Sequence, residues 1–223
     1  IATSLEHNGA FQRAAYILKE LKRRADEVEA EYAHVKKDSK IFLNYDLGFP
    51  EIVDSLVCLE QGDRQINILA FRNVDNVGSM VPLINVTKKD RLRVDLKTSA
   101  WIMGKLLKLY SFVSSEGFSV VSDASNILIE PKQHYVLIFD WTTAQVYPEA
   151  VPRDIQLREI SQAAQAVIMA LGGDWKTGVF PDDGEEAFKQ YTDHLLRLSR
   201  ESESNAQRAH TKFYELVDLL WPR

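Results

Sequence analysis

The chain has 223 residues, of which 45% are hydrophobic, enough to build one large domain or two small ones. Its formal net charge is −5, and the absence of a basic stripe disfavours nucleic acid or an anionic membrane as a partner. A single cysteine, Cys58, excludes an internal disulfide and a thiolate metal cluster, and it favours a reducing, cytoplasmic location. No apolar run is long enough to predict a membrane span.

Residues 1–38 predict a long amphipathic helix. From Phe11 to Val35, apolar or small residues recur at alternating steps of three and four, which is a heptad pattern. The positions between them carry charges of both signs, as expected for a solvated face. Two interpretations are open. The apolar seam packs on the chain's own domain, or it forms a coiled coil with a second copy or another protein partner.

The next segment, residues 40–96, changes to short β-rich runs separated by turn residues. This alternation of short β-rich runs and turn residues predicts an antiparallel meander, in which QGD at 61–63 is the clearest hairpin turn. Residues 97–223 predict a mainly helical unit that contains one hairpin. Its first helix has Thr98 or Ser99 as the expected N-cap and ends near Gly117.

The most informative stretch is the predicted hairpin at 122–141, SDASNILIEPKQHYVLIFDW. Asn126 precedes its first apolar run, and Asp140 follows its second. Both residue types are common in turns, where their side chains bond nearby backbone amides. Each one alone therefore has an ordinary structural explanation, and only the surrounding elements give the pair a functional one.

A buried helix, a loop ending in Asn, a hairpin ending in Asp and a further buried helix resemble the larger lobe of protein kinases. Asn126 resembles the Asn of the kinase motif H-R-D-x-x-x-x-N, and Asp140 resembles the Asp of D-F-G. The resemblance implies that these two residues hold the Mg²⁺ that bridges nucleotide phosphates. Downstream, 159–173 resembles the long buried kinase helix, with Glu159 in the place of an Asp that braces the catalytic loop.

The fold implied by this resemblance is α+β and protein kinase-like. It consists of the helix over 1–38, a reduced antiparallel β small lobe over 40–96 and a helical large lobe over 97–223. The resemblance is most specific over 98–173.

Several kinase residues are missing from their expected positions. The H-R-D positions fall on Ser119, Val120 and Val121, and valine cannot accept the proton of a substrate hydroxyl. Asp123 is a candidate substitute base, although an exposed acid in a loop turn is the simpler interpretation.

The small lobe departs from the pattern as well. QINILAFR resembles the strand that carries the phosphate-contacting Lys of V-A-I-K, and it puts Arg72 in the place of that Lys. Arg keeps the charge but not the geometry of an ammonium group. The sequence also lacks a G-x-G-x-x-G loop and has too few residues after Arg72 for the helix that supplies the partner Glu.

These features leave three functional interpretations. The favoured one is a pseudokinase, a partner-binding or regulatory scaffold with at most weak affinity for ATP and Mg²⁺, because three catalytic elements are lost together. The second is an atypical kinase that phosphorylates a protein or small molecule, with Asp123 as base and Arg72 on the phosphates. The third is a structural coiled-coil protein with an unrelated α+β domain.

Overall fold

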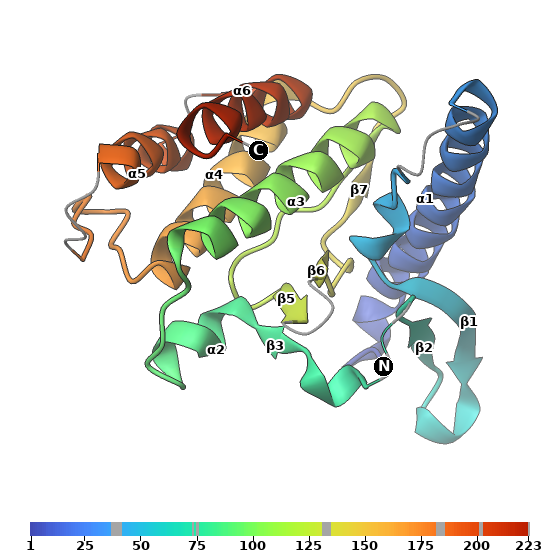
Figure 1. Cartoon of the computed structure of the whole chain (residues 1–223). Coiled ribbons are helices and arrows are strands. Elements are labelled where there is room, and N and C mark those ends of the chain that lie inside the picture. The colour runs from blue at the N-terminus through green and yellow to red at the C-terminus, as the bar shows by residue number, and fades with distance from the viewer. Residues whose placement is uncertain are drawn as a thin grey trace.

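A long N-terminal helix, small antiparallel sheets and a mainly helical remainder make up an α+β structure, as the sequence predicts (Figure 1). This computed structural model describes residues 1–36, 42–72, 74, 76–130, 135–181, 186–200 and 203–222. The helices are α1 (Asn8–Val35), α2 (Leu83–Lys88), α3 (Leu96–Ser115), α4 (Arg153–Ala170), α5 (Glu186–Ser199) and α6 (Ala206–Leu220). The strands are β1 (Glu51–Cys58), β2 (Arg64–Ala70), β3 (Val81–Pro82), β4 (Phe118–Ser119), β5 (Ile127–Glu130), β6 (Tyr135–Ile138) and β7 (Gln145–Val146).

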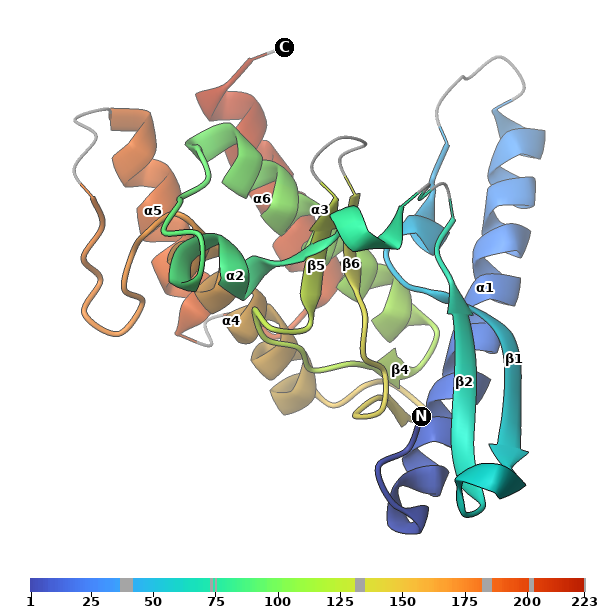
Figure 2. The ribbon, with the colours of Figure 1, turned by 90° about the horizontal axis from the view of Figure 1, so that it is seen from below.

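Helix α1 packs against the β1–β2 hairpin on one side of the molecule (Figure 2). Its apolar seam is buried in the chain's own core from Ala14 through Leu18 and Leu21 to Ala25. The seam becomes solvated further along, and Val35 is 76% exposed. Over its first half, therefore, the heptad pattern reflects packing within the chain.

Polar contacts also hold the second half of α1 to the rest of the molecule. The carboxylate of Glu29 accepts hydrogen bonds from the backbone N–H groups of Leu43 and Asn44, at 2.9 to 3.0 Å. Arg24 forms an ion pair with Glu116, just beyond the end of α3, with Nε and Oε2 2.7 Å apart. These contacts fix α1 against both the segment before β1 and the helical half.

The β1–β2 hairpin is antiparallel, with Leu56 opposite Ile66. The predicted QGD turn is confirmed, since Gly62 and Asp63 both adopt positive φ, of 67° and 59°. Of the other strands expected over 40–96, only the two residues of β3 (Val81–Pro82) form one, and they pair with β5 instead of continuing a meander. The segment 45–47 forms a 3₁₀ turn, and 91–95 contains no strand. Residues 40 and 41 lie outside the described residues.

The apolar run 80–87, expected as a strand, divides instead into the two-residue strand β3 and the helix α2. Pro82 ends β3 because proline has no backbone N–H to continue a ladder, and its fixed φ suits the residue that precedes a helix. Val81 pairs with Ile129 of β5, so β3 forms a three-stranded sheet with β5 and β6.

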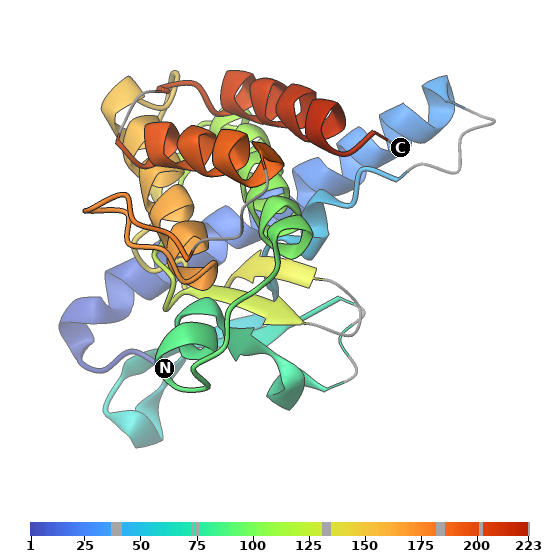
Figure 3. The same cartoon turned by 60° about the vertical axis from the view of Figure 1, so that its left-hand side comes forward.

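Helices α3, α4, α5 and α6 gather on one side of the β5–β6 hairpin (Figure 3). Helix α3 is buried around most of its circumference, as expected from its sequence, and its N-cap is Asp95 rather than Thr98 or Ser99. The Asp95 carboxylate accepts hydrogen bonds from the backbone N–H and the hydroxyl of Thr98. In the described ranges, none of the helices combines the length and apolar character that crossing a bilayer requires.

Gly117 ends α3 with a φ of +75°. A Cβ at this position would lie 2.8 Å from the carbonyl oxygen of Tyr147, so a side chain has no room there. The close approach allows β4 to pair with β7, with Phe118 opposite Val146. This pairing brings the loop before β5 and the segment after β6 to the same place.

Candidate functional site

The structure brings Asn126 and Asp140 together at the end of the β5–β6 hairpin. The Asn126 carboxamide donates from Nδ2 to the carbonyl oxygen of Asp140 at 2.8 Å, and its Oδ1 accepts the Asp140 N–H. The Asn126 carbonyl accepts the N–H of Phe139 at 3.1 Å. The Asn126 side chain therefore closes the strand ends by bonding both backbone groups of Asp140.

The carboxylate of Asp140 is exposed to solvent. Its Oδ1 accepts the N–H of Thr142 at 2.8 Å, which forms a local Asx turn. Within the described residues, Oδ2 has no hydrogen-bond partner, so it is fully open to a ligand. A cavity of about 250 Å³ adjoins it, between α1, β2 and the segment 139–142.

The loop that precedes Asn126 is anchored to buried polar groups of two helices. The Glu159 carboxyl of α4 is 1% exposed, and its Oε1 accepts the N–H of Val120 at 2.6 Å. The Tyr110 hydroxyl of α3 lies 2.9 Å from the Ser122 hydroxyl. Glu159 therefore braces this loop, as the resemblance implies. Burial raises the pKa of Glu159 to about 8, because desolvation penalises the charged form.

Asp123, the candidate base, lies at the start of a turn in this loop and is exposed. Its Oδ1 accepts hydrogen bonds from the backbone N–H and the hydroxyl of Ser125, and its carbonyl oxygen accepts the Asn126 N–H at 3.1 Å. The bond from the Ser125 hydroxyl lowers the pKa of Asp123. A carboxylate whose charged form is stabilised in this way is a weaker proton acceptor.

Arg72, the candidate phosphate ligand, is held by a different partner, although the ring of the preceding Phe71 stacks on that of Phe139 at 6.1 Å. It follows the end of β2 instead of lying within the strand, and its guanidinium pairs with the buried carboxylate of Asp46 at 2.5 Å. This bond raises the pKa of Arg72. Lys22 of α1 lies 3.7 Å from the same carboxylate. Among the described residues, no contact joins Arg72 to Asn126 or Asp140.

A residue that sequence reasoning missed is Arg13 of α1. Its Nε donates to the carbonyl of Ala144 at 2.8 Å, and a second guanidinium nitrogen donates to the carbonyl of Thr142 at 3.3 Å. Arg13 thereby holds the segment that directly follows Asp140. In the sequence it is one of many charged residues between the heptad positions, and nothing in the helical pattern distinguishes it.

The arrangement does not fit a two-residue Mg²⁺ site. A hard cation needs several oxygen ligands, but here the Asn126 carboxamide is bonded on both sides by the backbone and Asp140 offers a single unbonded oxygen. Searching the described part of the chain for three or more His, Cys, Asp or Glu side chains grouped as metal ligands gives none. Comparison of the chain with protein-family models finds no match, and no curated protein is significantly similar to it.

Proposed function

We propose that this chain is a kinase-like domain that does not transfer phosphate and acts as a partner-binding or regulatory scaffold. The observation that carries the proposal is the bonding of the Asn126 carboxamide to the backbone of Asp140. In this arrangement the Asn126 side chain has a structural role, because it holds the two ends of the hairpin together. The residues at the expected H-R-D positions, including Val120 and Val121, supply no acid or base.

The order and bracing of the elements support the kinase-like part of the proposal. Helix α3 leads through an anchored loop to Asn126, the β5–β6 hairpin leads to Asp140, and the buried helix α4 follows. The Glu159 carboxyl reaches back to the loop in the way that the resemblance implies. The third interpretation, an unrelated α+β domain, does not account for the occurrence of this bracing together with the Asn–Asp pair.

The atypical-kinase alternative requires Asp123 as a base and Arg72 on the phosphates of ATP. Asp123 accepts two bonds from Ser125, and Arg72 is paired with the buried Asp46. Both groups would have to give up these partners before they acted in phosphoryl transfer. The alternative is therefore disfavoured on two independent grounds.

The partner surface proposed from the sequence was the N-terminal helix. Because its seam is buried as far as Ala25, a protein partner or a second copy that uses α1 would contact its solvated half, which includes Tyr32 and Val35. Sedimentation of the Tyr32→Lys/Val35→Lys double variant tests this surface. A concentration-dependent dimer in the wild-type chain that the variant loses supports it, and a dimer that persists in the variant rejects it.

Unfolding by urea with and without ATP and Mg²⁺ tests the nucleotide part of the proposal. A ligand that binds only the folded state stabilises it by RT ln(1 + [L]/Kd), so a millimolar or weaker Kd gives at most about 0.4 kcal/mol at 1 mM ligand. We expect a gain no larger than this, and no ATP turnover. The proposal would be refuted by a larger gain in the free energy of unfolding that is lost in Asp140→Ala but kept in Asp90→Ala. The second variant is the control, because Asp90 is an exposed acid elsewhere in the chain. Turnover that Asp123→Ala abolishes would establish the atypical kinase instead.

A further inference from the structure

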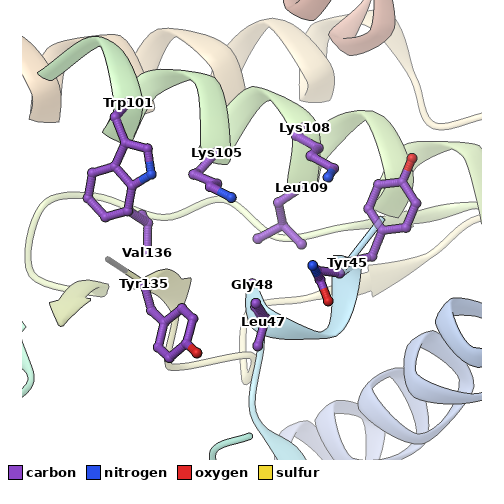
Figure 4. Close-up of a pocket in the computed structure, with 10 residues that line it drawn as sticks. Tyr45, Leu47, Gly48, Trp101, Lys105, Lys108, Leu109, Tyr135 and Val136 are labelled. Atoms are coloured by element: carbon purple, nitrogen blue, oxygen red, sulfur yellow. The ribbon is translucent and has the colours of Figure 1, made fainter. Parts of the chain in front are cut away.

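A second cavity lies between α3, the segment 44–48 and β6 (Figure 4). Its volume is about 280 Å³, and it shares no lining residue with the cavity beside Asp140. The Glu29 carboxylate holds the backbone N–H groups at the start of one wall. Gly48 lies so close to α3 that a Cβ there would meet the Leu109 side chain at 2.8 Å. The cavity is therefore bounded by elements that are fixed to one another.

Lys105 and Lys108 of α3 both line this cavity. They are three residues apart, which makes them neighbours on one face of the helix, and Figure 4 shows both ammonium groups on the side of α3 that faces the segment 44–48. Burial, and then the neighbouring charge of Lys105, lowers the pKa of Lys108, while the carboxylate of Glu29 acts in the opposite direction. Within the described residues, these two like charges therefore share one small space that no carboxylate lines.

Several hydrogen-bond donors of this cavity have no acceptor. An ammonium group has three N–H donors, and Lys108 uses one of them on the Leu43 carbonyl. The Tyr45 ring, whose centre lies 5.1 Å from Lys108 Nζ, attracts the same ammonium and helps to hold it at the cavity. Within the described residues, the Lys105 ammonium has no hydrogen bond or ion pair, and the Asn44 carboxamide on the facing wall has no hydrogen bond. Free donors therefore come from two walls, and one of these walls is positively charged.

We propose that this cavity binds a phosphate group in its dianionic form, either as inorganic phosphate or at the end of a small organic molecule. The phosphate lies between α3 and the segment 44–48, where its oxygens accept hydrogen bonds from Lys105, Lys108 and the Asn44 carboxamide. A phosphate group suits two neighbouring ammonium groups because it combines a charge of about −1.5 to −2 at pH 7 with several strong acceptor oxygens.

The size of the cavity limits what the phosphate can carry. Its volume lies just below the range of about 300–1,000 Å³ typical of ligand pockets, so any organic part of the ligand is small. This binding activity uses other residues than the proposed scaffold function, and the two can fail separately.

Calorimetric titration with butyl phosphate, and with butyl sulfate as its monoanionic counterpart of similar shape, tests the proposal at about pH 7.5, where the phosphate is a dianion. We expect the wild-type chain to bind butyl phosphate about tenfold more tightly than butyl sulfate, because the second negative charge strengthens the hydrogen bonds from the ammonium groups. Lys105→Met should lower the affinity for butyl phosphate about tenfold. Lys97→Met removes the same charge from an exposed position of the same helix, outside the cavity, and should leave that affinity unchanged.

Inorganic phosphate is the third probe, and it identifies the source of the phosphate group. Weaker binding of inorganic phosphate than of butyl phosphate assigns the cavity to a small phosphate ester. Equal or tighter binding of inorganic phosphate assigns the cavity to the free ion.

Lys105→Arg provides the positive counterpart, because it keeps the charge and should retain the affinity for butyl phosphate to within about threefold. Equal affinity of the wild-type chain for butyl phosphate and butyl sulfate would overturn the proposal, as would absence of saturable binding of both phosphates at millimolar concentration. Equal losses in Lys105→Met and Lys97→Met would overturn it too, since they would show only a general charge effect. The comparison of the two esters uses the wild-type chain alone, so it decides the question even where a variant fails to fold.

Discussion

The buried carboxyl of Glu159 predicts a specific dependence of stability on pH. Its Oε1 accepts the Val120 N–H, while Oε2 is buried and has no hydrogen-bond partner within the described residues. The substitution Glu159→Gln keeps an oxygen for Val120 and removes the ionisation. It therefore separates the acceptor role of Glu159 from the cost of charging it in the core.

The magnitude follows from the pKa, which burial raises from 4.5 to about 8. Between these values the folded protein holds a proton on Glu159 that the unfolded chain has lost, so the contribution of Glu159 to stability falls as the pH rises through this window. At 1.36 kcal/mol per pKa unit, the full cost above pH 8 is about 5 kcal/mol. Below about pH 4.5 both states are protonated and the cost disappears.

Urea unfolding of the two proteins at pH 5, 7 and 9, followed by circular dichroism, measures this cost. We expect the stability of Glu159→Gln relative to the wild type to rise by about 4 kcal/mol from pH 5 to pH 9. A constant offset is expected in addition, because the new amide N–H₂ group is buried. Taking the difference between the proteins cancels the titration of all other groups.

Glu149→Gln is the matched control, because it makes the same substitution at an exposed position. A Glu159→Gln difference that stays constant within about 1 kcal/mol from pH 5 to pH 9 would refute the reasoning. It would mean that Glu159 is charged in the folded protein throughout this range.

Three further predictions concern other parts of the molecule. Leu21→Ala should lower the free energy of unfolding by about 2–5 kcal/mol and Val35→Ala by no more than about 0.5 kcal/mol. Both effects should be independent of protein concentration. Equal effects of the two variants in urea titrations would contradict the packing of α1 within the chain. Asn126→Ala should cost about 1–3 kcal/mol and Asp140→Ala about 0.5 kcal/mol, and the reverse order would show that Asn126 does not close the hairpin. Burial lowers the pKa of His194 to about 4, so the stability of His194→Phe relative to the wild type should rise as the pH drops from 6.5 towards 4; a difference in urea midpoints that stays constant would disprove this.

The sequence predicted the parts of the fold in which one strong local pattern decides the structure. The heptad pattern gave α1, the continuous apolar composition gave the buried α3, and QGD gave the β1–β2 turn. The proximity of Asn126 and Asp140 was also predictable, because an antiparallel hairpin necessarily brings its two ends together.

Other features depend on tertiary contacts that the local sequence does not encode. Residues 80–87 read as a strand by composition, yet only Val81 and Pro82 find a partner strand, and the following residues become helical. Arg72 matched a motif position, but the nearby carboxylate of Asp46 determines where its guanidinium points. The exposed positions of α1 gave no sign that Arg13 would reach a segment so far along the chain.

That distance has a consequence for how the protein is made. Arg13 and the carbonyl that it bonds, at Ala144, are 131 residues apart. At about 5–20 residues per second, a ribosome completes this separation in roughly 7 to 26 seconds. During that interval α1 is already synthesised, and the β1–β2 hairpin and α3 are synthesised before Ala144 is reached. The bond from Arg13 to the Ala144 carbonyl can therefore form only after α1 has had time to pack against the β1–β2 hairpin.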